Sequence, residues 1–403
     1  MMQIAGRMAT ARESGTARIA RITGKLEASG KRVLKLNVGE PDFDTPGFIV
    51  EAAHRAMVAG QTRYTEITGT VELRAAVAEK FRRENNIDCT GDSVIVGTGA
   101  KQLIFNALMA SVEPGDEVLI PTPSWVSYPD MTMIAGGRPV LVACAEVDGF
   151  KVDVTQLEAK ISDSTRWIIL NSPCNPTGSV YSREELGEIA GLLRHHPRVA
   201  VMCDDIYEKI TFDGLRFATM AEVAPDIAGR VLTVNGVSKS HAMTGWRIGY
   251  ATGPRQLITA MARLQSQSTT NPSSIGQAAA LAALTETEQS DRFIAACKAA
   301  YLRRRDRLLQ RISAIPGLRP IKPEGAFYSF VECRHLFGRT TPAGIRLQDD
   351  TGLCEYFLHA AGVSLVPGLE FSGGGYFRLS FSVADEVLDE AVDRLEESVR
   401  ALI

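Results

Sequence analysis

The chain has 403 residues, of which 45% are hydrophobic and 23% are charged. This length and composition are sufficient to bury a large core and to form roughly two domains. The formal net charge of −3 leaves no excess of positive charge of the kind that binds nucleic acid or an anionic membrane surface. Both classes of partner are therefore excluded, and small molecules are the expected partners.

The cysteines indicate a reducing compartment. The chain has seven of them, scattered and free of any C-x-x-C pair, which argues against a disulfide framework and against a zinc site. No stretch of the sequence is long and apolar enough to predict a membrane span. We therefore expect a cytoplasmic protein without a metal site. The segment 1–22 is rich in arginine, as in organellar transit peptides, but we interpret it as an N-terminal arm.

From residue 47 onward, helix-like and strand-like segments alternate. Apolar spacing typical of helices occurs at 100–112, 182–194 and 255–267, and short apolar runs suited to buried strands occur at 93–97, 117–121, 167–171, 199–203 and 231–235. This alternation predicts an α/β domain. After about residue 290, a long charged helix, extended pieces near 327–331 and 377–381 and a closing amphipathic helix predict a smaller α+β domain. We expect the hinge near 285–295.

Polar or glycine-rich residues follow four of the predicted strands. In an open parallel sheet, ligands bind outside the carboxyl ends of the strands. The four segments expected to face one crevice are 97–101, 171–178, 204–207 and 236–239. The first of them, Gly-Thr-Gly-Ala-Lys, opens a predicted helix whose backbone N–H groups would favour a phosphate. In isolation, such a glycine is more often only part of a tight turn.

Lys239 stands out because it follows an apolar strand and is flanked by small and apolar residues. A lysine is ordinarily a solvated surface charge, but desolvation at this position would lower its pKa and make its amine a nucleophile. Asp204 and Tyr207 follow another strand, and a loop with two prolines offers the amide of Asn175. Taken singly, these residues are compatible with a helix cap, a core tyrosine and a plain turn. Arg247 is placed to neutralise a nearby anion.

Four motifs together resemble those of the class I aminotransferases of pyridoxal-enzyme fold type I. They are Gly-Glu-Pro-Asp-Phe-Asp-Thr-Pro at 39–46, Asn-Ser-Pro-Cys-Asn-Pro-Thr-Gly at 171–178, Asp-Ile-Tyr-Glu at 205–208 and Ser-Lys-Ser with Met-Thr-Gly-Trp-Arg-Ile-Gly-Tyr at 238–250. The similarity is greatest to the bacterial-type aspartate and prephenate aminotransferase branch. It implies a large domain (47–290) with a mostly parallel seven-stranded sheet. The arm (1–46) and the C-terminal segment (291–403) would form the smaller α+β domain.

The resemblance also implies roles around a pyridoxal 5′-phosphate cofactor. Lys239 would hold the cofactor as a Schiff base and move the reacting proton. Asp204 would keep the pyridine nitrogen protonated. The other implied cofactor contacts are Gly99, Ala100, Lys101, Trp125, Asn175, Tyr207, Ser238 and Arg247, with Tyr64 supplied by the second subunit of a homodimer. The sites would then be completed across the subunit interface.

The implied substrates are amino acids and 2-oxo acids. Arg378 would grip the substrate α-carboxylate, and the implied neighbours of the substrate are Gly39, Trp125 and Asn175. Lys101 would bind a second carboxylate, and Thr16 resembles a position linked to prephenate use. These roles imply ping-pong transamination of aspartate and 2-oxoglutarate to oxaloacetate and glutamate, with prephenate to arogenate as a further reaction.

Alternatives and departures from the pattern stay open at this point. An aminotransferase for aromatic or other amino acids, or a lyase or synthase of the same fold, would share the early cofactor chemistry. A dinucleotide-binding oxidoreductase is disfavoured because 97–101 lacks the third glycine of that fingerprint. Gly236 and Ser124 replace a serine and an aromatic residue common in the family, and residues 336–350 form a loop without an evident role.

Overall fold

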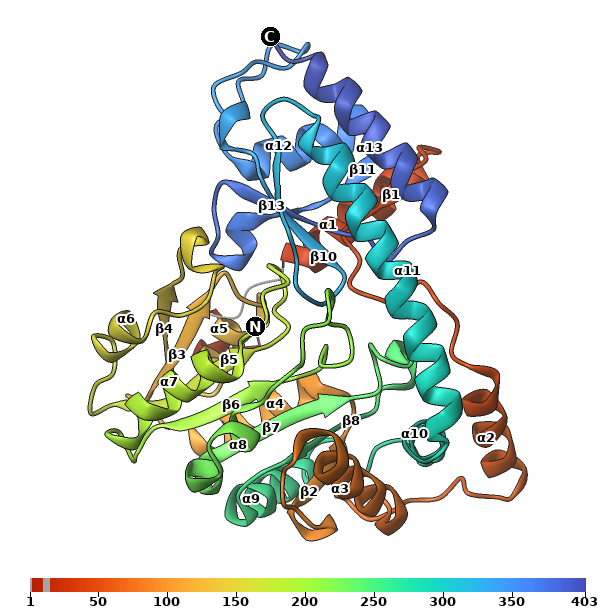
Figure 1. The fold of residues 1–403 in the computed structure, drawn as a ribbon, viewed down its shortest axis with the longest axis vertical. Helices are drawn as coiled ribbons and strands as arrows, with labels where there is room; N and C mark the ends of the chain where they lie inside the picture. Colours follow the sequence, from red (N-terminus) through yellow and green to blue (C-terminus); the bar gives the residue numbers. More distant parts are fainter. Residues whose placement is uncertain (1, 10–14) are drawn as a thin grey trace.

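The computed structural model describes residues 2–9 and 15–403 (Figure 1). Its largest sheet has seven strands in the order β2-β8-β7-β6-β5-β3-β4. Neighbouring strands are parallel except around β8, which is antiparallel to both β2 and β7. The strands are β2 Val94–Gly97, β3 Glu117–Thr122, β4 Arg138–Ala143, β5 Thr165–Asn171, β6 Ala200–Asp204, β7 Val231–Gly236 and β8 Gly249–Thr252. The mostly parallel seven-stranded sheet is therefore confirmed.

All five predicted apolar runs form strands of this sheet, whereas β4 and β8 were not predicted as strands. β4 is an edge strand in which only Val142 is buried, although its sequence, Arg-Pro-Val-Leu-Val-Ala, contains an apolar run. β8 has only four residues and begins with a glycine, which weakens the sequence pattern of a strand. Both strands depend on their neighbours for their conformation.

Helices cover both faces of the large sheet (Figure 1). Side chains alternate along each strand, so that Val94 and Val96 enter the core on one face and Ile95 enters the core on the other. The first core is shared with α3, α7, α8 and α10, and the second with α4, α5 and α9. The helices around the large sheet are α2 Gly47–Val58, α3 Val71–Asn85, α4 Ala100–Ser111, α5 Ser127–Ile134, α6 Val154–Glu158, α7 Arg183–Arg194, α8 Met220–Val223, α9 Arg255–Ser266 and α10 Ser274–Thr285.

A second, antiparallel sheet has the order β12-β13-β10-β9. Its strands are β9 Arg319–Ile321, β10 Tyr328–Glu332, β12 Val366–Pro367 and β13 Tyr376–Ser380. The helices of this part are α1 Gly15–Ala28, α11 Thr287–Ser313, α12 Asp350–Tyr356 and α13 Asp385–Arg400. β1 Leu34–Lys35 pairs in parallel with β11 Val363–Ser364, so the N-terminal segment joins the C-terminal part of the chain.

α11 links the two sheets. Only Glu286 separates it from α10, and in Figure 1 it runs from the large sheet to the second sheet. The predicted boundary at residue 290 falls within this helix, and the domain boundaries stay predictions.

In the loop 336–350, Thr340 exchanges two backbone hydrogen bonds of 2.9 Å with Ile403, which attaches the end of the chain. No helix in the described ranges is long and apolar enough to cross a membrane.

Candidate active site

A cavity of about 790 Å³ lies where the carboxyl ends of β5, β6 and β7 meet the start of α4 and the strands β10 and β13. The predicted site residues that line it are Gly39, Ala100, Lys101, Trp125, Asn175, Asp204, Tyr207, Ser238, Lys239, Arg247 and Arg378. Gly99 and Tyr64 do not line it, and Tyr64 is 89% exposed. The side chain of Thr16 lies outside the described part of the chain.

Lys239 extends into this cavity from the turn that follows β7. Its ammonium donates a hydrogen bond of 2.6 Å to the backbone carbonyl of Gly39. Burial, with contributions from the positive charges of Arg247 and Arg378, lowers the pKa of Lys239 to about 8. Roughly a tenth of its amine is therefore neutral and nucleophilic at pH 7, far more than in a solvated lysine.

Asp204 ends β6 and is 5% exposed. Its Oδ2 accepts a 2.6 Å hydrogen bond from the hydroxyl of Tyr128, while its Oδ1 is buried without a partner among the described residues. Burial raises the pKa of Asp204 to about 6. A buried carboxylate oxygen without a partner is costly, so this atom is suited to a cationic N–H group of a ligand.

An anion cradle forms at the start of α4. Gly99 caps the helix with a φ of 84°, a conformation that glycine adopts without strain. A Cβ at Gly99 would collide with the guanidinium of Arg247, so this glycine also makes room for the arginine. The Nη1 of Arg247 is held at 2.8 Å from the carbonyl oxygen of Thr244. The helix N-terminus and the guanidinium together favour a phosphate or another anion.

Arg378 is a second cationic site and is 2% exposed. It donates hydrogen bonds to Oδ1 of Asn175 at 2.9 Å and to the carbonyl oxygen of Asn37 at 2.7 Å. Its Nε is buried and has no partner within the described ranges, and its guanidinium lies 4.4 Å from the ring centroid of Tyr328. These acceptors are neutral, so the positive charge is available to a carboxylate from a ligand.

Lys101 provides a further cation in the cavity. Its ammonium lies 4.7 Å from the ring centroid of Trp125, within the range of a cation–π contact. Desolvation and the positive charge of Arg247 lower the pKa of Lys101. An anionic group of a ligand would offset this unfavourable environment.

Two tyrosines of the cavity were missed from the sequence. The hydroxyl of Tyr328 is hydrogen-bonded to that of Tyr207 at 2.8 Å, and Tyr128 contacts Asp204. Tyr128 lies at the start of α5 and follows Trp125 by three residues. Residues at this spacing lie on the same side of a helix, so the sequence could have indicated that Tyr128 accompanies Trp125. Tyr328 gives no such signal, because its place depends on the pairing of β10 with β13.

The two departures from the family pattern lie outside the main cavity. Ser124 lines a separate cavity of about 20 Å³ together with Pro123 and Cys174. Gly236 pairs with Gly249, and a Cβ at Gly236 would lie 3.1 Å from the Cα of Gly249 and from Cδ1 of Ile206. A larger residue at Gly236 would therefore press on the neighbouring strand.

The chain is similar to known proteins over almost all of its length. Residues 31–395 match the family model described as aminotransferase class I and II. The chain is 47% identical to an aspartate aminotransferase of Rhizobium meliloti strain 1021, over 98% of this chain and 95% of that protein. It is 46% identical to an aspartate/prephenate aminotransferase of Cereibacter sphaeroides, over 96% of both chains.

Solved structures show the same fold. The crystal structure of a Rhizobium meliloti aspartate aminotransferase superposes with a TM-score of 0.97 at 45% identity, covering 100% of both chains. An aspartate aminotransferase of Thermus thermophilus, solved with maleate, gives a TM-score of 0.92 at 40% identity and covers 99% of this chain and 100% of that one. The chain therefore belongs to the class I and II aminotransferase family.

Proposed function

We propose that this chain transfers amino groups between dicarboxylic amino acids and 2-oxo acids, with pyridoxal 5′-phosphate as its cofactor. The observation that carries the proposal is that Lys239, Asp204 and Arg378 line one cavity. The residues present fit the cofactor. The partnerless Oδ1 of Asp204 suits its protonated pyridine nitrogen, and the cradle of Gly99 and Arg247 suits its phosphate.

When bound, the cofactor supplies an electron sink that stabilises negative charge at the substrate Cα. Lys239 would attach it through the neutral amine and, once displaced by the substrate, would carry the proton away from Cα. Asp204 would keep the pyridine nitrogen charged. Tyr207 and Asn175 would orient the phenolic oxygen by hydrogen bonds, Trp125 would cover the ring, and Ser238 and the backbone of Ala100 and Lys101 would hold the phosphate.

The cations of the cavity support dicarboxylic substrates. Arg378 would pair with the α-carboxylate, with Gly39 beside it, and Lys101 would pair with a side-chain carboxylate. The relatives named above are aspartate aminotransferases, and maleate, present in the Thermus thermophilus structure, is itself a dicarboxylate. A neutral amino acid would leave the Lys101 ammonium without an anion.

Lys101→Met tests this specificity. The substitution keeps the stem that covers Trp125 but removes the charge, which we expect to lower kcat/KM for aspartate by roughly 10- to 100-fold, a loss of about 1.5–3 kcal/mol for a charged hydrogen bond. The kcat/KM for alanine, which has no second carboxylate, should change less than threefold. Equal losses for both substrates would assign Lys101 to the cofactor and not to the substrate side chain.

Prephenate is a second candidate acceptor. It carries two carboxylates, and the similar Cereibacter sphaeroides protein is named an aspartate/prephenate aminotransferase. The cavity offers cations for both carboxylates in Arg378 and Lys101. Measuring arogenate formed from prephenate and glutamate decides the matter, and absence of product alongside normal aspartate turnover would remove prephenate from the proposal.

A homodimer would complete the site. Tyr64 is 89% exposed and away from the cavity of its own chain, and Val50, Met57, Val58 and Val71 on the neighbouring helices are exposed apolar side chains. Exposed apolar clusters of this kind mark interfaces. In a dimer, Tyr64 would reach the cofactor phosphate of the other subunit.

Mixing two inactive or impaired variants tests this arrangement. In a dimer of one Lys239→Ala chain and one Tyr64→Ala chain, one site contains both wild-type residues if Tyr64 acts across the interface. We therefore expect the mixed, refolded sample to be more active than either variant alone. No recovery from a sample shown by sedimentation to contain mixed dimers would contradict the shared site.

A further inference from the structure

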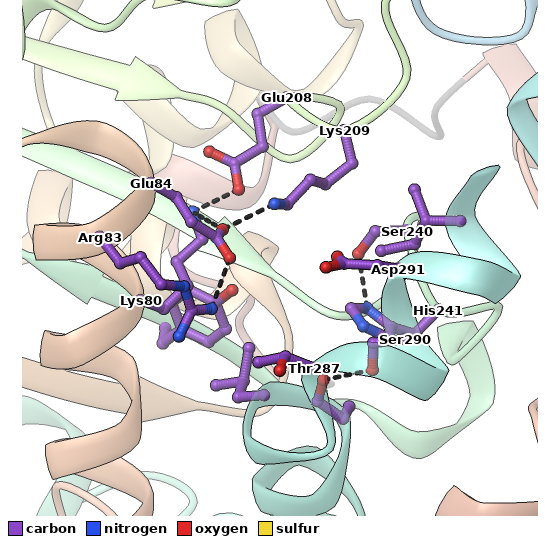
Figure 2. Close-up of a pocket in the computed structure, with 14 residues that line it drawn as sticks. Lys80, Arg83, Glu84, Glu208, Lys209, Ser240, His241, Thr287, Ser290 and Asp291 are labelled. Carbon is purple, nitrogen blue, oxygen red and sulfur yellow. Dashed lines mark hydrogen bonds and ion pairs between the residues drawn. The ribbon is translucent and has the colours of Figure 1, made fainter.

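Figure 2 shows a cluster of charged and polar side chains around a small space, among them Glu208 and Lys209. These two residues directly follow Tyr207 in the chain. The residues of this charged cluster are Lys80, Arg83, Glu84, Asn85, Glu208, Lys209 and His241. They come from α3, from the segment that follows β6 and from the segment that carries Lys239. The cluster surrounds an enclosed space of about 20 Å³ and is not part of the main cavity.

Lys80 and Glu208 are the centre of this cluster. Their side chains are 2% and 6% exposed and form an ion pair. Asn85 connects to both partners, because its Oδ1 accepts from the Lys80 ammonium at 2.7 Å and its Nδ2 donates to Oε2 of Glu208 at 2.8 Å. Each charge therefore has a partner of opposite charge and a further hydrogen bond, as a buried pair requires.

The surrounding charges reinforce this arrangement. Glu84 lies 3.8 Å from Lys80 and 2.7 Å from Lys209. Burial raises the pKa of Glu84, but the charges of Lys80 and Lys209 outweigh burial and hold that pKa below its usual value. His241 contributes no charge at neutral pH, because burial lowers its pKa to about 4.

The backbone connects the ion pair to the active site. Glu208 directly follows Tyr207, and its N–H donates to the carbonyl oxygen of Asp205 at 3.0 Å, while the N–H of Ile210 donates to that of Tyr207 at 2.8 Å. These turns are tight. Asp204 and Tyr207 line the main cavity, whereas Glu208 lines the space of the charged cluster. A displacement of Glu208 would therefore move Tyr207 directly.

We propose that the buried Lys80–Glu208 pair is a positioning device that fixes Tyr207 and Asp204 in the cavity by anchoring their segment to α3. A buried ion pair adds little net stability over an apolar pair of similar size, which leaves orientation as its contribution. The inference rests on the proposed function, because Tyr207 is assigned there to the phenolic oxygen of the cofactor. Lys80 and Glu208 are positioning residues and do not touch the substrate.

The test uses the holoenzyme of Lys80→Met, Glu208→Gln and the double variant Lys80→Met/Glu208→Leu. When Tyr207 shifts, the phenolic oxygen of the cofactor loses a hydrogen-bond donor. The Lys239 nitrogen that is bonded to the cofactor therefore keeps its proton to higher pH. We expect the pH midpoint at which the visible absorption band of the bound cofactor changes to rise. We also expect cofactor affinity to fall on the order of 10-fold, as when groups that orient metal ligands are removed.

The double variant separates positioning from folding. Because it leaves no charge unpaired, its thermal midpoint should fall less than that of either single variant, although buried Asn85 loses both of its hydrogen-bond partners, while the altered titration and weaker cofactor binding persist. Its result decides the question if a single variant does not fold. A wild-type titration midpoint and cofactor affinity in the double variant would overturn the proposal.

Arg305→Met is the matched control. Arg305 is also 2% exposed and forms ion pairs with Asp213 at 2.8 Å and Asp306 at 2.7 Å, but it lines neither space. It should lower thermal stability without moving the titration midpoint. An equal shift in this control would show that any lost buried pair disturbs the site, and would overturn the proposal. Absence of a visible band in the wild type would instead reject the proposed function itself.

Discussion

Lys239→Ala is expected to abolish amino-group transfer, lowering kcat by at least about 10⁴-fold, the upper range for loss of a general base. The reason is that one amine has two roles, attachment of the cofactor and movement of the proton. Among the described residues, the only other lysine that lines the cavity is Lys101, and its ammonium lies over the ring of Trp125. The measurement is steady-state turnover with the cofactor in excess.

The visible spectrum provides the control for this variant. The protein should still fold in the cofactor-free form, and it should lack the absorption band of cofactor linked to lysine. A variant that retained the band would place the attachment on another lysine. Lys239→Arg keeps a positive charge but no usable nucleophile, and it should be as inactive as the alanine variant.

The pH dependence of attachment follows from the lowered pKa. Only the neutral amine reacts, and burial lowers the pKa of Lys239 to about 8. In wild-type apoprotein, the rate of cofactor attachment should therefore rise roughly tenfold per pH unit below pH 8 and level off above it. An ordinary lysine would keep this rise going to about pH 10.4. Stopped-flow absorbance between pH 6 and pH 10 distinguishes the two.

Asp204→Asn should have the second largest effect, lowering kcat by roughly 10²- to 10⁴-fold, in the range of a lost electrostatic contact to developing charge. Asparagine retains an acceptor for the Tyr128 hydroxyl, which lies 2.6 Å from Oδ2 of Asp204. It cannot hold the pyridine nitrogen in its charged form, so the electron sink is weakened. The test is the single-turnover rate with aspartate and with aspartate deuterated at Cα, compared between the variant and the wild type.

The same substitution should stabilise the apoprotein. Burial raises the pKa of Asp204 to about 6, so the folded state binds its proton more tightly than the unfolded state does. Ionisation above pH 6 therefore costs folding stability, on the order of 2–3 kcal/mol, and this cost is absent below about pH 4. The variant should have the higher thermal midpoint at pH 8 and an equal one near pH 4. A lower midpoint at pH 8 would contradict this assignment.

The large sheet was largely predictable because its central strands are buried on both faces. Such strands are continuous apolar runs, as in Ile168, Ile169 and Leu170, and their pattern requires no knowledge of their partners. β8, with four residues beginning at a glycine, carries too little of this pattern, whereas β4 has an apolar run that was not predicted as a strand and that lies largely exposed at the sheet edge. Their conformation follows from pairing with β3, β2 and β7.

The site was predictable where motifs are local. Lys239, Asp204 and Asn175 each follow a strand, and parallel strands bring their carboxyl ends together. Tyr328 and Asn37 could not be found in this way. Their positions depend on contacts with Arg378, which is far away in the sequence. Local patterns do not encode such long-range packing, and nor do they encode the charged cluster around Glu208.

A single-turnover reaction tests the central claim most directly. Wild-type protein loaded with pyridoxal 5′-phosphate is mixed with aspartate, glutamate, alanine or phenylalanine in the absence of any 2-oxo acid, and the visible band is followed. Aspartate and glutamate should remove the band at least roughly 100-fold faster than alanine, because only they place a second carboxylate at Lys101. Loss of the band only with phenylalanine, or no band before mixing, would contradict a pyridoxal-dependent transaminase of dicarboxylic amino acids.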